Sequence, residues 1–236
     1  MSELLADVRR SPHRPSTIAI DGPAGSGKST VGLAVAECLG YLYFDTGVMY
    51  RAVTWLALHQ GLPITDEVAV TALAEVADID VTPPTVADGR QVTVLVNGFD
   101  VTWGIREPQV GAHVSIVAAY GGVRAALVIQ QRRVALRGRV IMVGRDIGTV
   151  VMPDADLKIF LDASLEKRAE RRWLEEQSRG GQRTVQQVQE ELHTRDVIDS
   201  TRQHSPLTIA LDAVYLDTTQ YGIDQVVDQV MTLVQA

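Results

Sequence analysis

Short apolar runs alternate with amphipathic stretches along most of this 236-residue chain. The runs TIAI at 17–20 and YLYF at 41–44 have the length and the composition of buried strands. The stretch after each run repeats apolar residues at helical spacing and ends at a glycine, Gly40 or Gly61, as helices commonly do. Strands and helices in alternation predict an α/β fold, in which a parallel sheet carries helices on both faces. Three later runs are also predicted strands: 139–144, 157–162 and 213–218.

The alternation is interrupted between residues 62 and 110. The run QVTVLV alternates apolar and polar residues, Asn97-Gly98 is a favoured hairpin turn, and FDVT at 99–102 leads back. This pattern predicts a small antiparallel subdomain at 62–110, inserted between the core segments 17–61 and 111–236.

The rest of the chain is predicted to be mainly helical between its strands. A long helix is expected from Val110 to about Leu136, interrupted at Gly121-Gly122, and an arginine-rich helix at 164–178. The segment SRGGQR then indicates a mobile loop, and a further helix begins at a capping-box pattern, Thr184 to Gln187. Apolar residues at helical spacing from Ile223 onward predict a closing helix.

Charge and composition exclude several classes of protein. The net charge of −7 argues against binding to a nucleic acid polymer, because such proteins carry a basic face. No apolar run reaches the ~18 residues of a membrane span, so no membrane association is expected. Residues 1–16 lack the apolar core of a secretory signal and are expected to form a disordered leader. The sole cysteine, Cys38, is expected to be a small buried hydrophobe, and its having no partner fits a reducing cytoplasm.

The segment GPAGSGKS at 22–29 matches G-x-x-x-x-G-K-[ST] at every fixed position, between a predicted strand and a predicted helix. Such a P-loop holds the phosphates of a nucleoside triphosphate on backbone N–H groups and a helix N-terminus. Lys28 is expected to reach the β- and γ-phosphates, and the Ser29 hydroxyl to bind Mg²⁺. The expected ATP-binding residues are Gly22, Pro23, Ala24, Gly25, Ser26, Gly27, Lys28, Ser29 and Thr30.

A P-loop by itself does not define the reaction, since switch GTPases, ATPases and small-molecule kinases share it. The guanine-reading N/T-K-x-D and the D-x-x-G of GTPases are missing from the sequence. The run LKIFLD at 157–162 could pass for the metal-binding strand of a large ATPase, but its late position favours an ordinary strand end for Asp162.

Charged residues follow two predicted strands, at Asp45-Thr46-Gly47 and at Gly144-Arg145-Asp146. Carboxyl ends of parallel strands share one edge of a sheet, so these groups are expected near the bound phosphates, although a lone strand-end Asp is often only a helix cap. Arg195, Asp199 and Arg202 line one face of a helix, which in isolation would suggest a solvent-exposed ion pair. Together with Arg51 and Arg145, these arginines exceed what one triphosphate requires. The excess indicates a second anionic substrate, as in a nucleoside monophosphate kinase.

Taken together, these motifs show that the chain resembles the bacterial-type cytidylate kinases from Thr17 to its C-terminus. The resemblance is carried by DTGVMYRA, VSIVAAYGGVR, GRDIGTVVMPDADLKIFLDAS, RAERR, RDVIDSTRQHSPL and DAVYLDTT, together with the P-loop. The sequence departs from that family at Val143, where an acidic residue is common, at Gly121, where proline is usual, and at Val48, where alanine is usual. The resemblance implies that the insertion binds the nucleoside monophosphate and that a short lid lies at about 170–190.

The resemblance also implies residue roles. Ser115, Arg124 and Asp146 would read cytosine, and Arg195 and Asp199 would hold the ribose. The acceptor phosphate would be clamped by Arg51, Arg145 and Arg202, in a pocket lined by Thr46 and Tyr50, and Arg171 would contact ATP. The implied catalytic residues are Lys28, Arg145, Arg195 and Arg202.

The expected activity is therefore transfer of the ATP γ-phosphoryl group to CMP or dCMP, with Mg²⁺, in the cytoplasm and by a monomer. Two alternatives remain open at the level of the sequence. One is a P-loop kinase for another small acceptor, such as UMP, AMP or a non-nucleotide metabolite. The other is a nucleotide-dependent switch or assembly ATPase without an acceptor.

Overall fold

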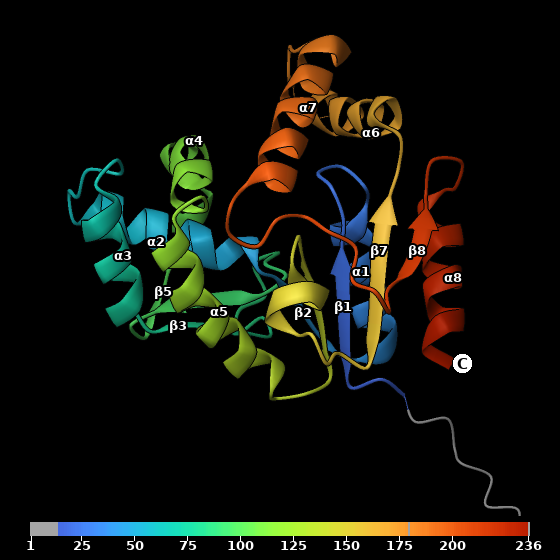
Figure 1. Ribbon diagram of the computed structural model, residues 1–236, viewed down its shortest axis with the longest axis horizontal. Coiled ribbons are helices and arrows are strands. Elements are labelled where there is room, and N and C mark those ends of the chain that lie inside the picture. Colours follow the sequence, from blue (N-terminus) through green and yellow to red (C-terminus); the bar gives the residue numbers. More distant parts are fainter. Residues whose placement is uncertain (1–13, 179, 236) are drawn as a thin grey trace, which may run out of the picture.

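The computed structural model describes residues 14–178 and 180–235 of the chain. Its main sheet has five parallel strands in the order β2-β6-β1-β7-β8 (Figure 1). The predicted parallel α/β sheet is thus confirmed. The strands are β1 (Thr17–Asp21), β2 (Leu42–Asp45), β6 (Val140–Gly144), β7 (Leu157–Asp162) and β8 (Val214–Asp217).

The central strands are buried on both faces, which explains why they read as continuous apolar runs. All five residues of β6 are buried, as are the last four of β1. Helices α1 (Lys28–Leu39) and α8 (Ile223–Gln235) pack together beside the sheet, while the π-helical turn η2 (Ile147–Val151) contacts β1, β6 and α5 (Gly121–Ala135). The sheet is therefore enclosed by helices, and its polar groups are confined to its ends.

The helix expected from Val110 to Leu136 is in fact two helices. Helix α4 (Pro108–Val117) and α5 meet at 103°, with the break at residues 118–120, just before Gly121. An interruption is therefore present, but its predicted position was wrong, since Gly121 and Gly122 are the first two residues of α5. Within the described ranges no single helix is long and apolar enough to cross a membrane; only α4 and α5 taken together have that length and composition.

The insertion contains the predicted antiparallel sheet, in the order β3 (Ile79–Thr82), β4 (Thr93–Val96) and β5 (Phe99–Asp100). Asn97 and Gly98 form its hairpin turn with φ of 51° and 81°, the conformation for which the Asn-Gly pair is favoured. The same segment also forms a helix that the strand pattern did not predict, α3 (Glu67–Val76), capped by the Asp66 carboxylate on the Ala69 N–H. Helix α3 packs on α5, and α2 (Gly47–His59) packs on α4 and on the short 3₁₀ turn η1 (Gly104–Arg106).

Helices α6 (Leu165–Gln177) and α7 (Val185–Thr201) pack against each other beyond the carboxyl ends of β1 and β7 (Figure 1). The predicted capping box is confirmed: the Thr184 hydroxyl accepts from the Gln187 N–H, and the Gln187 side chain accepts from the Thr184 N–H. The C-terminal end of α7, the lower end in Figure 1, approaches the sheet edge at which β1, β6 and β7 end.

Cys38 lies on α1 between the buried Ala36 and Leu39, but its own side chain is exposed. The prediction that Cys38 is buried was therefore wrong. Of the predicted leader, residues 1–16, residues 1–13 lie outside the described residues. Ser16 already pairs with the core, since its carbonyl accepts from the Val140 N–H and its own N–H donates to Asp156.

Candidate active site

The P-loop connects β1 to α1 in a conformation that demands glycine. Gly25 and Gly27 have φ of 78° and 93°, in the left-handed region that glycine favours. A Cβ at Gly22 would lie 2.0 Å from the carbonyl oxygen of Leu161, so the loop also packs too closely on β7 for any side chain. The motif is thus a built cradle whose shape depends on its glycines.

Lys28 begins α1 and folds back over this loop. Its side chain is buried, and its Nζ donates a hydrogen bond to the Pro23 carbonyl at 2.8 Å. Burial, and then repulsion from Arg145, lowers the pKa of Lys28 well below its ordinary value. An anion bound here would offset both effects, because it would return a counter-charge to a desolvated ammonium group.

Ser29 and Asp45 provide the oxygen atoms that suit a magnesium ion. The Ser29 hydroxyl lies 3.4 Å from Oδ2 of Asp45, whose Oδ1 accepts from the Gly47 N–H at 2.9 Å. Mg²⁺ typically binds through one or two protein oxygens, with water and substrate phosphates completing its shell. No cluster of three or more His, Cys, Asp or Glu residues that could hold a metal occurs in the described part of the chain. Val143, at the family's often acidic position, is buried and apolar.

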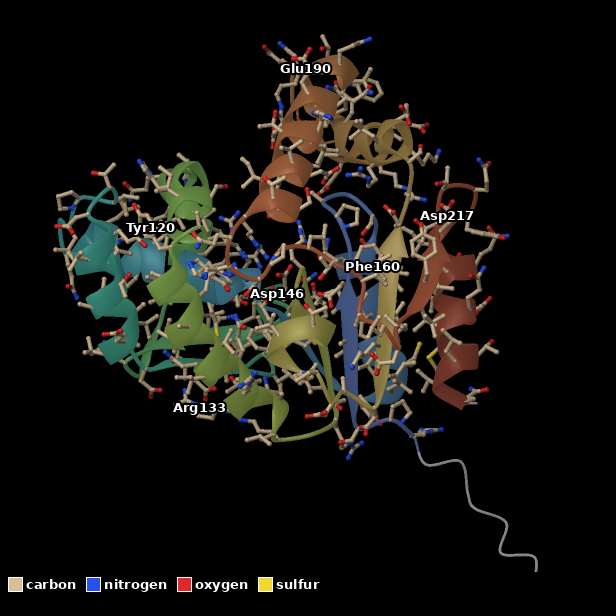
Figure 2. All side chains as sticks on the ribbon, viewed as in Figure 1. Tyr120, Arg133, Asp146, Phe160, Glu190 and Asp217 are labelled. Atoms are coloured by element: carbon tan, nitrogen blue, oxygen red, sulfur yellow. The ribbon has the colours of Figure 1, made fainter. Side chains whose placement is uncertain are left out.

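Asp146, just after β6, lies between two arginines from distant parts of the sequence. Figure 2 shows Asp146 between α5 and the sheet, beneath the lower end of α7. Its Oδ2 is 2.6 Å from Nη2 of Arg124 on α5, and its Oδ1 is 3.8 Å from Nη2 of Arg202 at the end of α7. The Arg124 guanidinium also lies over the ring of Tyr50, 5.3 Å from its centre. The three helices and the strand end thus converge on one buried charged group.

A second ion pair connects the same strand end to α7. Arg145 Nε donates to Oδ2 of Asp199 at 2.8 Å, and Oδ1 of Asp199 accepts from Arg202 Nη1 at 3.5 Å. Arg202 is held further by the bond from its Nε to the Ser205 carbonyl, at 2.6 Å. The resemblance implies that Arg202 binds a phosphate together with Arg51 and Arg145. In the structure Arg202 contacts Asp146 and Asp199, so it adjoins the residues expected to read the base and the ribose.

Two of these guanidinium groups retain buried donors that have no hydrogen-bond partner among the residues described by the structure. They are Nε of Arg124 and Nη2 of Arg202, the latter too far from Asp146 for a hydrogen bond. Buried polar atoms are rarely left unpaired in folded proteins, since each unpaired donor costs free energy. Donors of this kind, aligned around one site, are suited to the oxygen and nitrogen acceptors of a ligand.

The other residues predicted for the acceptor site do not contact the charged group around Asp146 through hydrogen bonds or ion pairs between described residues. Thr46 is buried and donates to the Val143 carbonyl at 3.1 Å, and Arg51 reaches the Ile105 carbonyl at 3.4 Å. Burial, and then repulsion from Arg106, lowers the pKa of Arg51. Ser115 on α4 and Arg195 on α7 are exposed, and neither side chain hydrogen-bonds to another described residue.

Arg171 lies on the other side of the P-loop. It donates to the Thr218 carbonyl at 2.6 Å and to the Thr218 hydroxyl at 3.0 Å, and that hydroxyl donates to the Ser26 carbonyl at 3.2 Å. Its Nη1 would be 3.9 Å from a Cβ at Gly27. Arg171 is therefore fixed beside the loop, on the side away from the Arg124–Asp146 pair.

Sequence reasoning assigned no role to two residues that organise this site. Arg168 is buried, donates to the Ala24 carbonyl of the P-loop at 3.0 Å and pairs with Asp196 of α7 at 2.7 Å. Asp21, at the end of β1, accepts from two backbone N–H groups of η2. Arg168 lies in a stretch that carried the resemblance and Asp21 directly precedes the P-loop, but the partners of each are far away in sequence.

The chain is similar to known proteins over most of its length. The family model described as cytidylate kinase matches residues 18–236. The chain is 58% identical over 186 residues to the cytidylate kinase of Chloroflexus aggregans, covering 79% of this chain and 81% of that protein. It is 47% identical over 220 residues to the cytidylate kinase of Herpetosiphon aurantiacus, covering 93% and 94%. A solved structure of an uncharacterized protein from Eubacterium ventriosum matches with a TM-score of 0.50 at 10% identity, covering 93% of this chain and 98% of that one, a likeness of fold alone.

Proposed function

This chain belongs to the cytidylate kinase family, and we propose that it transfers the γ-phosphoryl group of ATP to CMP or dCMP, releasing ADP and CDP or dCDP. The observation that carries the proposal is the group of charged side chains around Asp146, which lies beside the P-loop but is not part of it. A triphosphate alone leaves this group without a role. A second, anionic nucleotide would use it.

The acceptor base would be read at Arg124 and Asp146. The pair offers a carboxylate acceptor and an unpaired buried Nε donor, and a cytosine edge presents both an amino donor and ring and carbonyl acceptors. Ser115 is exposed on α4. It would join Arg124 and Asp146 in reading the base if α4 moved closer to the core. Arg195 and Asp199 would hold the ribose, with Thr46 and Tyr50 lining the pocket.

The acceptor phosphate would be bound by Arg51, Arg145 and Arg202. A phosphate oxygen is already anionic, so its attack on the γ-phosphorus requires no strong general base. Catalysis would then depend on alignment and on stabilising the charge as it moves between the two nucleotides. Lys28 and Arg145, with Arg195 and Arg202, are the cations that would supply this stabilisation.

ATP would occupy residues 22–30, with Arg171 on the donor side. Ser29 and Asp45 would hold Mg²⁺, which neutralises charge on the phosphates when it is bound. The segment at about 170–190 would act as a lid that excludes water and so limits ATP hydrolysis. All of these groups come from one chain, so we propose that the monomer is active. With one cysteine and a net charge of −7, we place it in the cytoplasm, acting on free nucleotides.

The proposal is tested by measuring ADP release with ATP and Mg²⁺ in the presence of CMP, dCMP, UMP, AMP or GMP. Strong stimulation by CMP and dCMP alone is expected. Stimulation by another acceptor instead would show a kinase of different specificity. ADP release that no acceptor increases would indicate a nucleotide-dependent ATPase and would overturn the proposal.

The assignment of Arg202 is tested separately with Arg202→Ala. This change should raise the KM for CMP while leaving ATP affinity nearly unchanged, since Arg202 contacts Asp146 and Asp199. Arg133→Ala, at an exposed arginine farther along α5, is the matched control and should change neither (Figure 2). An equal loss of ATP affinity in Arg202→Ala would show that this residue does not belong to the acceptor site.

A further inference from the structure

Asp21 is a buried carboxylate at the end of β1, immediately before the P-loop. Only 4% of its surface is exposed. Its Oδ1 accepts from the Ile147 N–H at 2.8 Å, and its Oδ2 accepts from the Gly148 N–H at 2.7 Å. These are the first two N–H groups of the π-helical turn η2, which would otherwise lack partners within the turn.

The same residue is fixed to the other side of this segment by the sheet. Asp21 and Gly144 are register partners in the parallel pairing of β1 with β6. The chain thus leaves β6 beside Asp21, passes through Arg145 and Asp146, and returns to the Asp21 carboxylate at Ile147. Arg145 and Asp146 form a two-residue bridge with both of its ends attached to one residue of β1.

Close packing at both ends of the bridge leaves it little freedom. A Cβ at Gly144 would lie 2.6 Å from Cδ1 of Ile147 and 2.9 Å from the Thr46 hydroxyl. A Cβ at Gly148 would lie 3.2 Å from Cδ of Lys158 and 3.4 Å from Oδ2 of Asp21. Because the backbone is held so tightly, the directions of the Arg145 and Asp146 side chains follow from the position of the turn.

We infer that Asp21 is a positioning residue for the acceptor site: by binding the start of η2 it sets Arg145 and Asp146 in place for their contacts with Asp199, Arg124 and Arg202. It also joins the acceptor site to the strand that carries the P-loop, so that the donor and acceptor phosphates are aligned by one strand end. The inference rests on the proposed function, since the acceptor is taken to be CMP.

The position is also costly, which argues that the carboxylate is not there for stability. Burial outweighs the two backbone hydrogen bonds and raises the pKa of Asp21 to about 6, with the Asp146 charge adding to the rise and Lys28 opposing it. Charged groups placed against the stability of a fold are characteristic of sites that serve function.

The test is Asp21→Asn, which keeps the shape of the side chain but can accept at only one of its two terminal atoms. We expect kcat to fall and the KM for CMP to rise by about tenfold, as for loss of one hydrogen bond to a charged group. The affinity for an ATP analogue should change by less than about twofold, and thermal stability should be retained. In amide hydrogen exchange, residues 147 and 148 should lose protection.

Asp156→Asn is the matched control. The Asp156 carboxylate accepts from the Ser16 and Thr17 N–H groups at 2.8 and 2.9 Å, a similar arrangement at the opposite end of the sheet. This variant should have native kinetics with either nucleotide. If Asp21→Asn does not fold, Gly148→Ala keeps the carboxylate and places a methyl group 3.2 Å from Cδ of Lys158 at the start of the turn. A shift of the turn away from this tight contact should raise the KM for CMP in preference to that for ATP.

Three results separate the possible failures. If Asp21→Asn lost stability but kept native kinetics, or lost affinity for both nucleotides equally, the positioning role would be wrong. If Asp21→Asn did not fold, either of these two results in Gly148→Ala would likewise show that the positioning role is wrong. If the native enzyme showed no turnover with CMP, the proposed function would fail instead, and hydrogen exchange at residues 147 and 148 would still report whether Asp21 holds the turn.

Discussion

Arg145 and Asp199 form an ion pair, 2.8 Å between Nε and Oδ2, that joins the carboxyl end of β6 to α7. Both side chains are largely buried, at 16% and 13% exposed, so the pair is shielded from solvent and should be stronger than a surface pair. It brings a cation of the sheet edge against the helix that also carries Arg195 and Arg202. The Arg145–Asp199 pair therefore links the sheet edge to α7 on the acceptor side of the proposed site.

Replacing Asp199 with Asn should weaken this assembly selectively. Arg145 would lose its counter-charge while remaining near Lys28, and kcat/KM for CMP should fall by about tenfold or more, the usual effect of losing a hydrogen bond to a charged group. Steady-state kinetics with CMP varied at saturating ATP would measure this.

Glu190→Gln removes a carboxylate from the same helix near its upper end and should leave the kinetics unchanged (Figure 2). A similar decrease in both variants would mean that the effect comes from the overall charge of α7 rather than from the Arg145–Asp199 contact.

Removing one partner of the buried Arg124–Asp146 pair should destabilise the fold far more than removing one partner of an exposed pair of similar length, because it leaves a buried charge uncompensated. In Asp146→Asn, two guanidinium groups lose their shared carboxylate, and the free energy of unfolding should decrease by about 3 kcal/mol. Asp78→Asn breaks the Arg133–Asp78 pair, 2.7 Å long but with side chains 49% and 65% exposed, and should cost less than about 1 kcal/mol. Urea denaturation followed by circular dichroism would compare the two; equal losses would contradict the difference in burial.

Two consecutive arginines of α6 should differ in their effect on ATP. Arg171 is bound to the Thr218 carbonyl beside Gly27, and Arg171→Ala should raise the KM for ATP by about tenfold while leaving that for CMP within about twofold. Arg172 is exposed and pairs with Glu176, so Arg172→Ala should leave both constants near native. The donor-side assignment of Arg171 would be refuted by a larger effect on CMP than on ATP.

Asp21 should make stability depend on pH in a particular direction. Its carboxyl pKa is raised from 3.8 to about 6 by burial, so the folded state holds this proton more tightly than the unfolded state. The stability that protonation provides is complete below pH ~4 and is lost as the pH rises through about 6. The charged and titratable neighbours of this carboxyl are Asp146, Lys28 and, behind Gly148, Lys158.

In Asp21→Asn the side chain at position 21 cannot titrate, whereas all other titratable groups are the same as in the native protein. The melting temperature of the variant minus that of the native protein should therefore increase between pH 5 and pH 7. A difference that stayed constant or decreased over this range would show that the native Asp21 does not carry a raised pKa. Calorimetry at several pH values with matched ionic strength would provide the measurement.

Much of this architecture could be predicted from local patterns in the sequence. The P-loop requires glycine at positive φ and a lysine at the start of a helix, and the Asn-Gly turn and the capping box each depend on a few neighbouring residues. Apolar runs and helical spacing likewise reported which segments would be strands and helices. The helix α3, at residues 67–76, was not predicted because the whole segment 62–110 was expected to follow the strand pattern seen only at 91–102. Cys38 was misplaced because it lies at the border of the buried stripe of α1.

The sequence by itself thus determined the phosphate-binding loop, the α/β class and the presence of an antiparallel insertion, because short-range backbone conformation and burial patterns are encoded within a few residues. Only the tertiary structure decided that β6 lies beside β1, which brings Asp21 against residues 147 and 148 across more than a hundred residues of chain. It also decided that Arg124, Asp146, Arg202 and Asp199 meet, while Ser115 and Arg195 stay exposed. These contacts depend on strand order and on helix packing, which are set by burial of the whole core and not by any local stretch.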